Sequence, residues 1–217
     1  MKHKIRVLGI AGKKGSGKDT LADYFVREAQ FNKVAYADTL KHMVNWLFDI
    51  PLDVLWGPSE KRDTRTRTIL QEFGTDFARK HDPDVWIRLF NKRVCGRYLP
   101  GEDESPCYIV VPDVRFPEEI HNLENNYTTR MVLIKRPGVE NDTADTTHQH
   151  STETLIDTFP ENQFDYILNN IGTREQLIQM AQTLSQIITW DADSVRSMSS
   201  CKTHESAPTP SLKDATD

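Results

Sequence analysis

The stretch Gly12-Lys13-Lys14-Gly15-Ser16-Gly17-Lys18-Asp19-Thr20 decides the fold of this chain. It follows an apolar run, Ile5 to Ala11, and precedes a helical pattern of apolar residues from Leu21 to Ala29. Glycines let a loop curl so that successive backbone N–H groups point inward, and the helix that follows turns its positive end to the same point. Because the spacing G-x-x-x-x-G-K is complete, we expect a phosphate-binding loop (P-loop) whose Lys18 reaches the outer phosphates of a nucleoside triphosphate. The alternative, a plain glycine turn between a strand and a helix, leaves the lysine unexplained.

The composition sets bounds on the class of protein. The chain has 217 residues and a net charge of −5, which suits one domain or slightly more and argues against binding nucleic acid through a basic surface. Three widely spaced cysteines without a C-x-x-C pair favour reduced thiols over disulfides or a zinc site: Cys95, Cys107 and Cys201. No stretch reaches the ~18 apolar residues of a membrane helix, and the residues before the first apolar run are too few for a signal peptide. We therefore expect a soluble, cytoplasmic chain with neither a membrane nor a direct nucleic-acid partner.

Five apolar segments with strand character alternate with helical patterns along the chain. They are Ile5–Ala11, Val34–Ala37, Tyr108–Val111, Arg130–Lys135 and Tyr166–Leu168. This alternation predicts a doubly wound α/β layer, in which helices flank a five-stranded parallel sheet. We expect residues 1–190 to form this domain, with a helical insert over about 51–100 and a disordered polar tail over 191–217.

The insert is predicted to carry a helix from about Thr66 to Lys80 with two unlike faces. One face is apolar, and the other combines an arginine, an amide, a glycine and a hydroxyl: Arg67, Gln71, Gly74, Thr75 and Ala78. A gap at Gly74 would let a flat ligand approach, whereas a plain amphipathic helix is the alternative. Trp86, in the next apolar stripe, fits either the core or the wall of a base pocket. Lys41 follows the second strand and lies either at the ligand-bearing edge or in solvent.

An aspartate and an arginine follow the strand Tyr108–Val111. Asp113 comes just past the predicted strand end, which is the position of a Walker B carboxylate that holds Mg²⁺ or its water shell. Arg115 points to the same side if the chain stays extended, so a simple ion pair with Asp113 is the alternative.

A polar segment over residues 137–150 suits a lid over an active site. It begins after Arg136, at the end of a buried strand. His148 and His150 lie within it, but no third metal ligand accompanies them. The P-loop, the insert and the lid together describe a small-molecule kinase of the nucleoside monophosphate type.

The chain resembles the bacteriophage deoxynucleoside monophosphate kinases, a family of P-loop enzymes, from about Ile5 to Ile188. The segments that carry the resemblance are Gly12–Thr20, Leu70–Asp76, Asp84–Trp86, Val111–Arg115, Arg136–Gly138, His150–Glu153 and Asn169–Gly172. The family has an aspartate after the P-loop lysine, where other P-loops have Ser or Thr; here it is Asp19, and Thr20 supplies the hydroxyl. The resemblance implies transfer of the γ-phosphoryl group of ATP to a deoxynucleoside 5′-monophosphate, with Mg²⁺.

The resemblance also implies site residues. ATP and Mg²⁺ would be held by Lys14, Gly17, Lys18, Asp19 and Thr20. Gly15, as a loop glycine, and Arg136, as a cation at a strand end, would add to this ATP site. The monophosphate would be bound by Lys41, Arg62, Gly74, Thr75, Trp86, Asp113, Arg115 and Glu119, which Gln71 joins from its helix face. Arg67 would span the two phosphate groups. Which of Lys61, Arg62 and Arg65 contacts the substrate stays open.

The chemistry of a monophosphate acceptor agrees with this reading. Its phosphate is already largely a dianion at pH 7, because its second pKa is near ~6. The acceptor oxygen needs no general base, and the enzyme must supply alignment and charge neutralisation. We therefore expect Lys18, Arg67 and Arg115 to act on the phosphoryl group, with Asp113 organising magnesium or substrate rather than accepting a proton.

Three other functions fit parts of the pattern. They are a P-loop kinase of another small phosphorylated metabolite, an NTP-hydrolysing switch or motor, and a non-catalytic nucleotide-binding module. The resemblance further suggests a homodimer and, for a viral chain, the host cytoplasm. The accepted bases and the choice between ribose and deoxyribose are not specified by the sequence.

Overall fold

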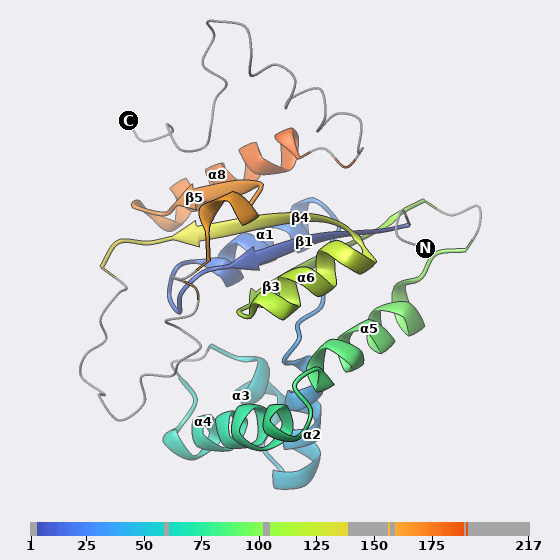
Figure 1. The fold of residues 1–217 in the computed structure, drawn as a ribbon. Coiled ribbons are helices and arrows are strands. Elements are labelled where there is room, and N and C mark those ends of the chain that lie inside the picture. Colours follow the sequence, from blue (N-terminus) through green and yellow to red (C-terminus); the bar gives the residue numbers. More distant parts are fainter. Residues whose placement is uncertain are drawn as a thin grey trace, which may run out of the picture. The chain divides into compact units, whose positions relative to one another are not determined.

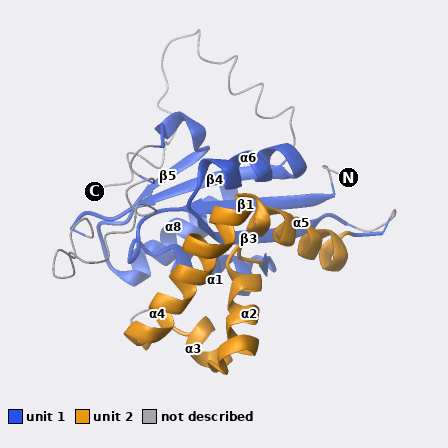
Figure 2. Cartoon of the chain, turned by 60° about the horizontal axis from the view of Figure 1, so that its bottom comes forward, with its two compact units in different colours: residues 1–33, 100–217 blue, residues 34–99 orange. Residues whose placement is uncertain are grey.

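The structure of the chain is a computed structural model that describes residues 4–58, 61–101, 105–138, 156, 159–188 and 190. It divides into two compact units, which Figure 2 distinguishes by colour. The sheet unit comprises Met1–Lys33 and Pro100–Asp217, and the helical unit comprises Val34–Leu99. Residues 139–150 of the predicted lid, including His148 and His150, and the predicted tail 191–217 lie outside the described residues.

The sheet unit is built on five parallel strands in the order β2-β3-β1-β4-β5 (Figure 1). Their bounds are β1 Ile5–Ala11, β2 Asn32–Lys33, β3 Cys107–Val114, β4 Thr128–Lys135 and β5 Tyr166–Asn169. The predicted α/β architecture with a five-stranded parallel sheet is therefore confirmed. The central strands are buried along most of their length, as expected for a sheet that is covered on both faces.

Helices cover both faces of this sheet. They are α1 Lys18–Glu28, α6 Pro117–Asn126 and α8 Arg174–Ile187, and a short 3₁₀ turn, η4, spans Glu161–Gln163. The even residues Leu8 and Ile10 of β1 lie in one apolar cluster with side chains of α1 and α8. The odd residue Gly9 faces the other way, since a Cβ there would lie 3.0 Å from Leu123 of α6. The alternation of side chains along β1 thus separates the two helical layers.

The second strand differs from the sequence prediction. Asn32 and Lys33 pair with Ile109 and Val110, whereas the predicted strand Val34–Ala37 forms no ladder. Asp38 explains the difference: its Oδ2 accepts the Ala35 N–H at 2.9 Å, and its own N–H donates to the Ala35 carbonyl at 3.2 Å. This local turn takes the backbone groups that a strand would have used.

The helical unit contains α2 Asp38–Phe48, α3 Leu52–Trp56, α4 Thr64–Gln71, a π-helix η2 Glu72–Arg79, and α5 Val85–Tyr98. Its core gathers Leu40, Val44, Ile50, Leu55 and Trp86. The predicted loop from Pro51 contains the short helix α3, which Pro51 itself opens. The predicted surface loop from Gly96 begins later, because α5 continues to Tyr98.

The predicted helix over residues 66–80 is also modified. Its first part is α-helical, with Asp63 as the N-cap that accepts the Thr66 N–H at 2.7 Å. Its second part is the π-helix η2, an uncommon form that widens the turn and is found disproportionately at functional positions. The widening changes which residues of η2 share a face, so the two faces drawn at 100° steps do not hold beyond Gln71.

Candidate functional site

The P-loop has the geometry that its sequence predicts. It connects β1 to α1, and three of its glycines have positive φ: +155° at Gly12, +75° at Gly15 and +105° at Gly17. Gly17 is the N-cap of α1, and no side chain caps the N–H groups of the first helical turn. These N–H groups and the positive end of α1 are the elements with which a P-loop binds phosphate.

Close packing requires two of these glycines independently of their φ angles. A Cβ at Gly12 would lie 2.5 Å from the backbone oxygen of Ile134, and one at Gly17 would lie 2.6 Å from Leu177 Cδ2. Asn170 adds a polar contact, because its Nδ2 donates to the Ser16 carbonyl at 2.9 Å. The loop is thus seated on the ends of β4 and β5 and the start of α8. Our sequence reasoning did not single out Asn170 as a site residue.

Lys18 lies at the first position of α1. Its Nζ donates to the Lys13 carbonyl at 2.6 Å, so the ammonium is folded back over the loop. Lys14, one residue further along the loop, is exposed, and Thr20 is half-buried in α1. The Lys18 ammonium, which should bind the outer phosphates, therefore already lies against the phosphate-binding loop.

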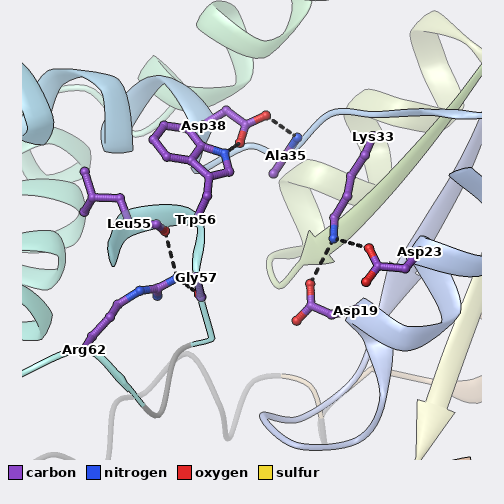
Figure 3. A network of polar contacts seen from close by, with 9 residues as sticks. All are labelled: Asp19, Asp23, Lys33, Ala35, Asp38, Leu55, Trp56, Gly57 and Arg62. Carbon is purple, nitrogen blue, oxygen red and sulfur yellow. Dashed lines mark hydrogen bonds and ion pairs between the residues drawn. The ribbon is translucent and has the colours of Figure 1, made fainter. Parts of the chain in front are cut away.

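Asp19 takes part in an ion-pair cluster that the sequence did not predict. Its side chain is 84% exposed, and Lys33 Nζ lies 3.3 Å from its Oδ1 and 3.0 Å from Asp23 Oδ1 (Figure 3). Burial lowers the pKa of Lys33, but the attraction of Asp19 and the hydrogen bonds to both carboxylates outweigh it, so the pKa lies above its ordinary 10.5. Lys33 therefore remains charged and partly neutralises Asp19.

Asp113 and Arg115 lie at the carboxyl end of β3. The strand continues to Val114, so Asp113 is its penultimate residue rather than lying past its end. Arg115, directly after the strand, is exposed. Buried Glu119 accepts the backbone N–H of Arg115 at 2.8 Å and of Phe116 at 3.2 Å. Its Oε2 thus holds the turn that carries Arg115.

Several predicted site residues of the sheet unit gather at one edge. Since β3, β1 and β4 are parallel neighbours, their carboxyl ends share that edge, which is where open α/β sheets bind ligands. The residues at or just beyond these ends are Lys14, Gly15, Gly17, Lys18, Asp113, Arg115 and Arg136. Arg136 is exposed directly after β4. The sheet edge therefore combines the P-loop with further cations.

The other predicted residues belong to the helical unit. Lys41 Nζ lies 5.2 Å from the centre of the Trp56 ring, a cation–π distance. The Trp56 Nε1 donates to Asp38 Oδ1 at 3.1 Å (Figure 3), and Arg93 Nη1 lies 3.4 Å from Asp38 Oδ2. Asp38 is buried, so this network fixes α2 against α3 and α5 and places Lys41 on its rim.

Arg62 is engaged with the backbone. Its Nη2 donates to the carbonyls of Leu55 and Gly57 at 2.8 and 3.1 Å (Figure 3), and its Nε donates to Val54 at 3.2 Å. These are carbonyls that α3 leaves unpaired at its C-terminal end, so Arg62 caps that helix. Lys61 and Arg65, by contrast, line a hollow of about 260 Å³ together with Asp63 and Thr66.

Gly74 and Trp86 form part of the core. A Cβ at Gly74 would lie 2.7 Å from Leu40 Cδ2, so Leu40 fills the gap that we predicted for a flat ligand. Trp86 is 4% exposed and donates from Nε1 to the Gly74 carbonyl at 2.9 Å. The structure thus favours the core over the base-pocket wall for Trp86. Of the other residues predicted on this helix, Arg67 is exposed, whereas Gln71 and Thr75 are half-buried.

The residues present fit a triphosphate and its magnesium ion. The buried Ser16 Oγ has no hydrogen-bond partner among the described residues, so this hydroxyl of the loop can bond to a ligand. No three His, Cys, Asp or Glu side chains within the described ranges gather into a metal cluster. Mg²⁺ is commonly bound by one or two carboxylates together with substrate phosphates. Asp19 and Asp113, with the Thr20 hydroxyl, match that pattern.

A strand–glycine loop–helix unit with a lysine at the start of the helix, on a parallel sheet, defines a protein of the P-loop kinase superfamily. The family model for deoxynucleotide monophosphate kinase matches residues 56–180, which is more than half of the chain. The chain belongs to the deoxynucleotide monophosphate kinase family and is therefore a phosphotransferase. The P-loop lies outside the matched residues and supports the same class independently.

Known proteins resemble the chain at modest identity. A protein of Acanthamoeba polyphaga mimivirus with the provisional name deoxynucleotide monophosphate kinase is 28% identical over 199 residues, covering 83% of this chain and 98% of the viral one. The uncharacterised protein ORF77 of Ictalurid herpesvirus 1 (strain Auburn) is 31% identical over 157 residues, covering 72% and 61%. A dephospho-CoA kinase from Campylobacter jejuni superposes with a TM-score of 0.46 at 14% identity, covering 84% of this chain and 96% of the kinase.

None of the helices in the described part of the chain has the length and apolar character that a bilayer span requires.

Proposed function

We propose that the protein transfers the γ-phosphoryl group of ATP to a deoxynucleoside 5′-monophosphate, giving ADP and the diphosphate. The P-loop carries the proposal: three glycines of positive φ and Lys18 present a phosphate site in a chain of this kinase family. The provisional name of the mimivirus relative, whose length the chain covers almost completely, supports the acceptor.

On the donor side, the loop N–H groups and Lys18 bind the ATP phosphates. Lys18 exchanges its bond to the neutral Lys13 carbonyl for one to a negatively charged phosphate oxygen, which is the stronger bond because both partners are ionised. Bound Mg²⁺ neutralises charge on the phosphates, and Asp19, Thr20 and Asp113 are the residues that would hold it or its water shell. Lys14 and Arg136 add positive charge around the donor.

On the acceptor side, cations orient a phosphate that is already ionised. We expect Arg115, Lys41 and Arg67 to act on this phosphate, with Lys61, Arg62 or Arg65 as an additional contact. Gln71 and Thr75 offer hydrogen bonds to the nucleoside. Asp113 accepts no proton, because the acceptor oxygen carries none to give. Residues 137–150 act as the lid that keeps water from the transferring group.

A coupled ADP-release assay tests this proposal. The enzyme is given ATP, Mg²⁺ and each of a panel of ribo- and deoxynucleoside monophosphates, with gluconate and dephospho-CoA as other acceptors and Lys18→Ala as the control variant. We expect ADP release that depends on a deoxynucleoside monophosphate and fails in the variant. Release that is independent of any acceptor would favour an NTP-hydrolysing switch, and release with another metabolite would favour a different kinase.

The cellular setting is part of the proposal. A kinase that feeds deoxynucleotide supply for DNA synthesis would act in the cytoplasm, or in the host cytoplasm if the chain is viral. We propose that it acts on small-molecule nucleotides without binding nucleic acid, and that it forms a homodimer. Size-exclusion chromatography with light scattering tests the homodimer, which a monomer at micromolar concentration would contradict.

A further inference from the structure

A buried asparagine, 154 positions further along the chain, contacts Ser16 of the P-loop. Asn170 directly follows β5 and is 3% exposed. Its backbone N–H donates to the Lys135 carbonyl at 2.7 Å, which extends the ladder between β4 and β5. Its Nδ2 donates to the Ser16 carbonyl at 2.9 Å, in a buried contact. The sheet thus fixes the position of an amide donor whose acceptor is the main chain of the P-loop.

The accepted carbonyl belongs to the peptide bond between Ser16 and Gly17. In a trans peptide, the C=O of one residue and the N–H of the next point in opposite directions, and the described chain has no cis bond. When Asn170 holds the Ser16 carbonyl, it therefore turns the Gly17 N–H away from β5. In a P-loop, backbone N–H groups that are free of other partners cradle the phosphates.

Gly17 makes the close approach of Asn170 possible. A Cβ at Gly17 would lie 2.9 Å from Asn170 Nδ2, so any other residue there would push the amide away. A hydrogen bond to a carbonyl also polarises the peptide and makes its N–H a better donor. The glycine and the asparagine therefore act as a pair, and both favour a Gly17 N–H directed at an anion.

We propose that Asn170 is a positioning residue for ATP, which orients the Ser16–Gly17 peptide so that its N–H binds the triphosphate. The inference rests on the proposed function, since it takes ATP as the P-loop ligand. A purely structural role is the competing reading, in which the bond only joins β5 to the loop. The two readings differ in what Asn170 changes: ATP affinity in the first case and thermal stability alone in the second.

The test compares two buried asparagines of the sheet unit. Asn170→Ala removes the donor to the loop, whereas the control Asn122→Ala removes a 7%-exposed amide of α6 that accepts from Asn126 Nδ2 at 3.0 Å. The Kd of ATP is measured by calorimetric titration, and the KM of the monophosphate is measured at saturating ATP. We expect Asn170→Ala to raise the Kd of ATP about tenfold, the size of one hydrogen bond, with the monophosphate KM unchanged. Asn122→Ala should lower the melting temperature and leave the Kd of ATP as in the wild type.

An unchanged Kd of ATP in folded Asn170→Ala would overturn the inference. If that variant does not fold, Asn170→Leu, with a side chain of similar size and no donor, takes its place. The wild-type chain gives a third readout by NMR: the Gly17 amide proton should move downfield when ATP is added, and an unmoved resonance would also refute the inference. A wild-type chain that binds no ATP would instead refute the proposed function.

Discussion

Replacement of Trp86 by phenylalanine separates its two possible roles. The substitution removes Nε1, so the buried Gly74 carbonyl loses its 2.9 Å hydrogen bond, and it leaves a gap beside Leu40. Loss of this buried hydrogen bond costs about 1 kcal/mol, and the gap left by the smaller ring adds to that, so we expect destabilisation of about 2–4 kcal/mol. For a chain of this size the melting temperature should fall by roughly 5–15 °C.

The assay is urea unfolding followed by circular dichroism, with Trp46→Phe as the matched control. Trp46 lies on α2 and is 81% exposed, so the same chemical change there should alter the free energy of unfolding by less than about 0.5 kcal/mol. At a temperature where both variants are folded, the KM of the monophosphate should equal that of the wild type. Equal stabilities of the two variants, with a monophosphate KM raised tenfold by Trp86→Phe alone, would refute the core role and restore the base-pocket wall.

Three further predictions concern single side chains. Lys18→Ala should lower turnover by about two to three orders of magnitude with little change in melting temperature, because the charge it supplies acts mainly in the transition state, and near-normal turnover would sink its assignment. Arg67→Lys and Arg115→Lys keep the charge but lose the planar fork, so steady-state kinetics should show at least about a tenfold loss in turnover or monophosphate binding; large destabilisation with wild-type kinetics would argue for a scaffold role. Asp63→Ala should destabilise α4, since hydrogen bonds from the Thr66 hydroxyl and N–H hold the pKa of Asp63 below its ordinary 3.8. A carboxylate whose pKa is lowered by folding stabilises the fold at pH values above its unfolded-state pKa, and this stabilisation is lost as the pH falls through the folded-state pKa. The unfolding curves of Asp63→Ala and the wild type should therefore converge in acid. A difference between the curves that widens in acid would contradict the role of Asp63 as a cap.

The sequence predicted the parts of the fold that depend on local pattern. The P-loop follows from its spacing, because few other arrangements use three glycines and a lysine between a strand and a helix. The capping box of Thr173 and Gln176 at the start of α8 is a second local pattern of this kind. In both cases, the residues that determine the structure are neighbours in the chain, so their chemistry can be read without knowledge of the fold.

The errors concern residues whose partners are distant or conformationally unusual. Leu40, more than thirty residues before Gly74, closes the predicted ligand gap, and no helical pattern can show that contact. The side chain of Asp38 converts the predicted strand Val34–Ala37 into a turn. Asn170 lies 154 positions from the Ser16 carbonyl that it binds, and the only local sign was its place directly after a short apolar strand.

The most direct test of the account follows the phosphoryl group itself. ATP labelled in its γ-phosphoryl group is mixed with Mg²⁺, the enzyme and one deoxynucleoside monophosphate at a time, and the products are separated by chromatography. We expect label to appear in the deoxynucleoside diphosphate for at least one base, and Lys18→Ala to abolish this transfer. Label found solely in inorganic phosphate, or in no product with any monophosphate, would contradict the assignment of this chain as a deoxynucleoside monophosphate kinase.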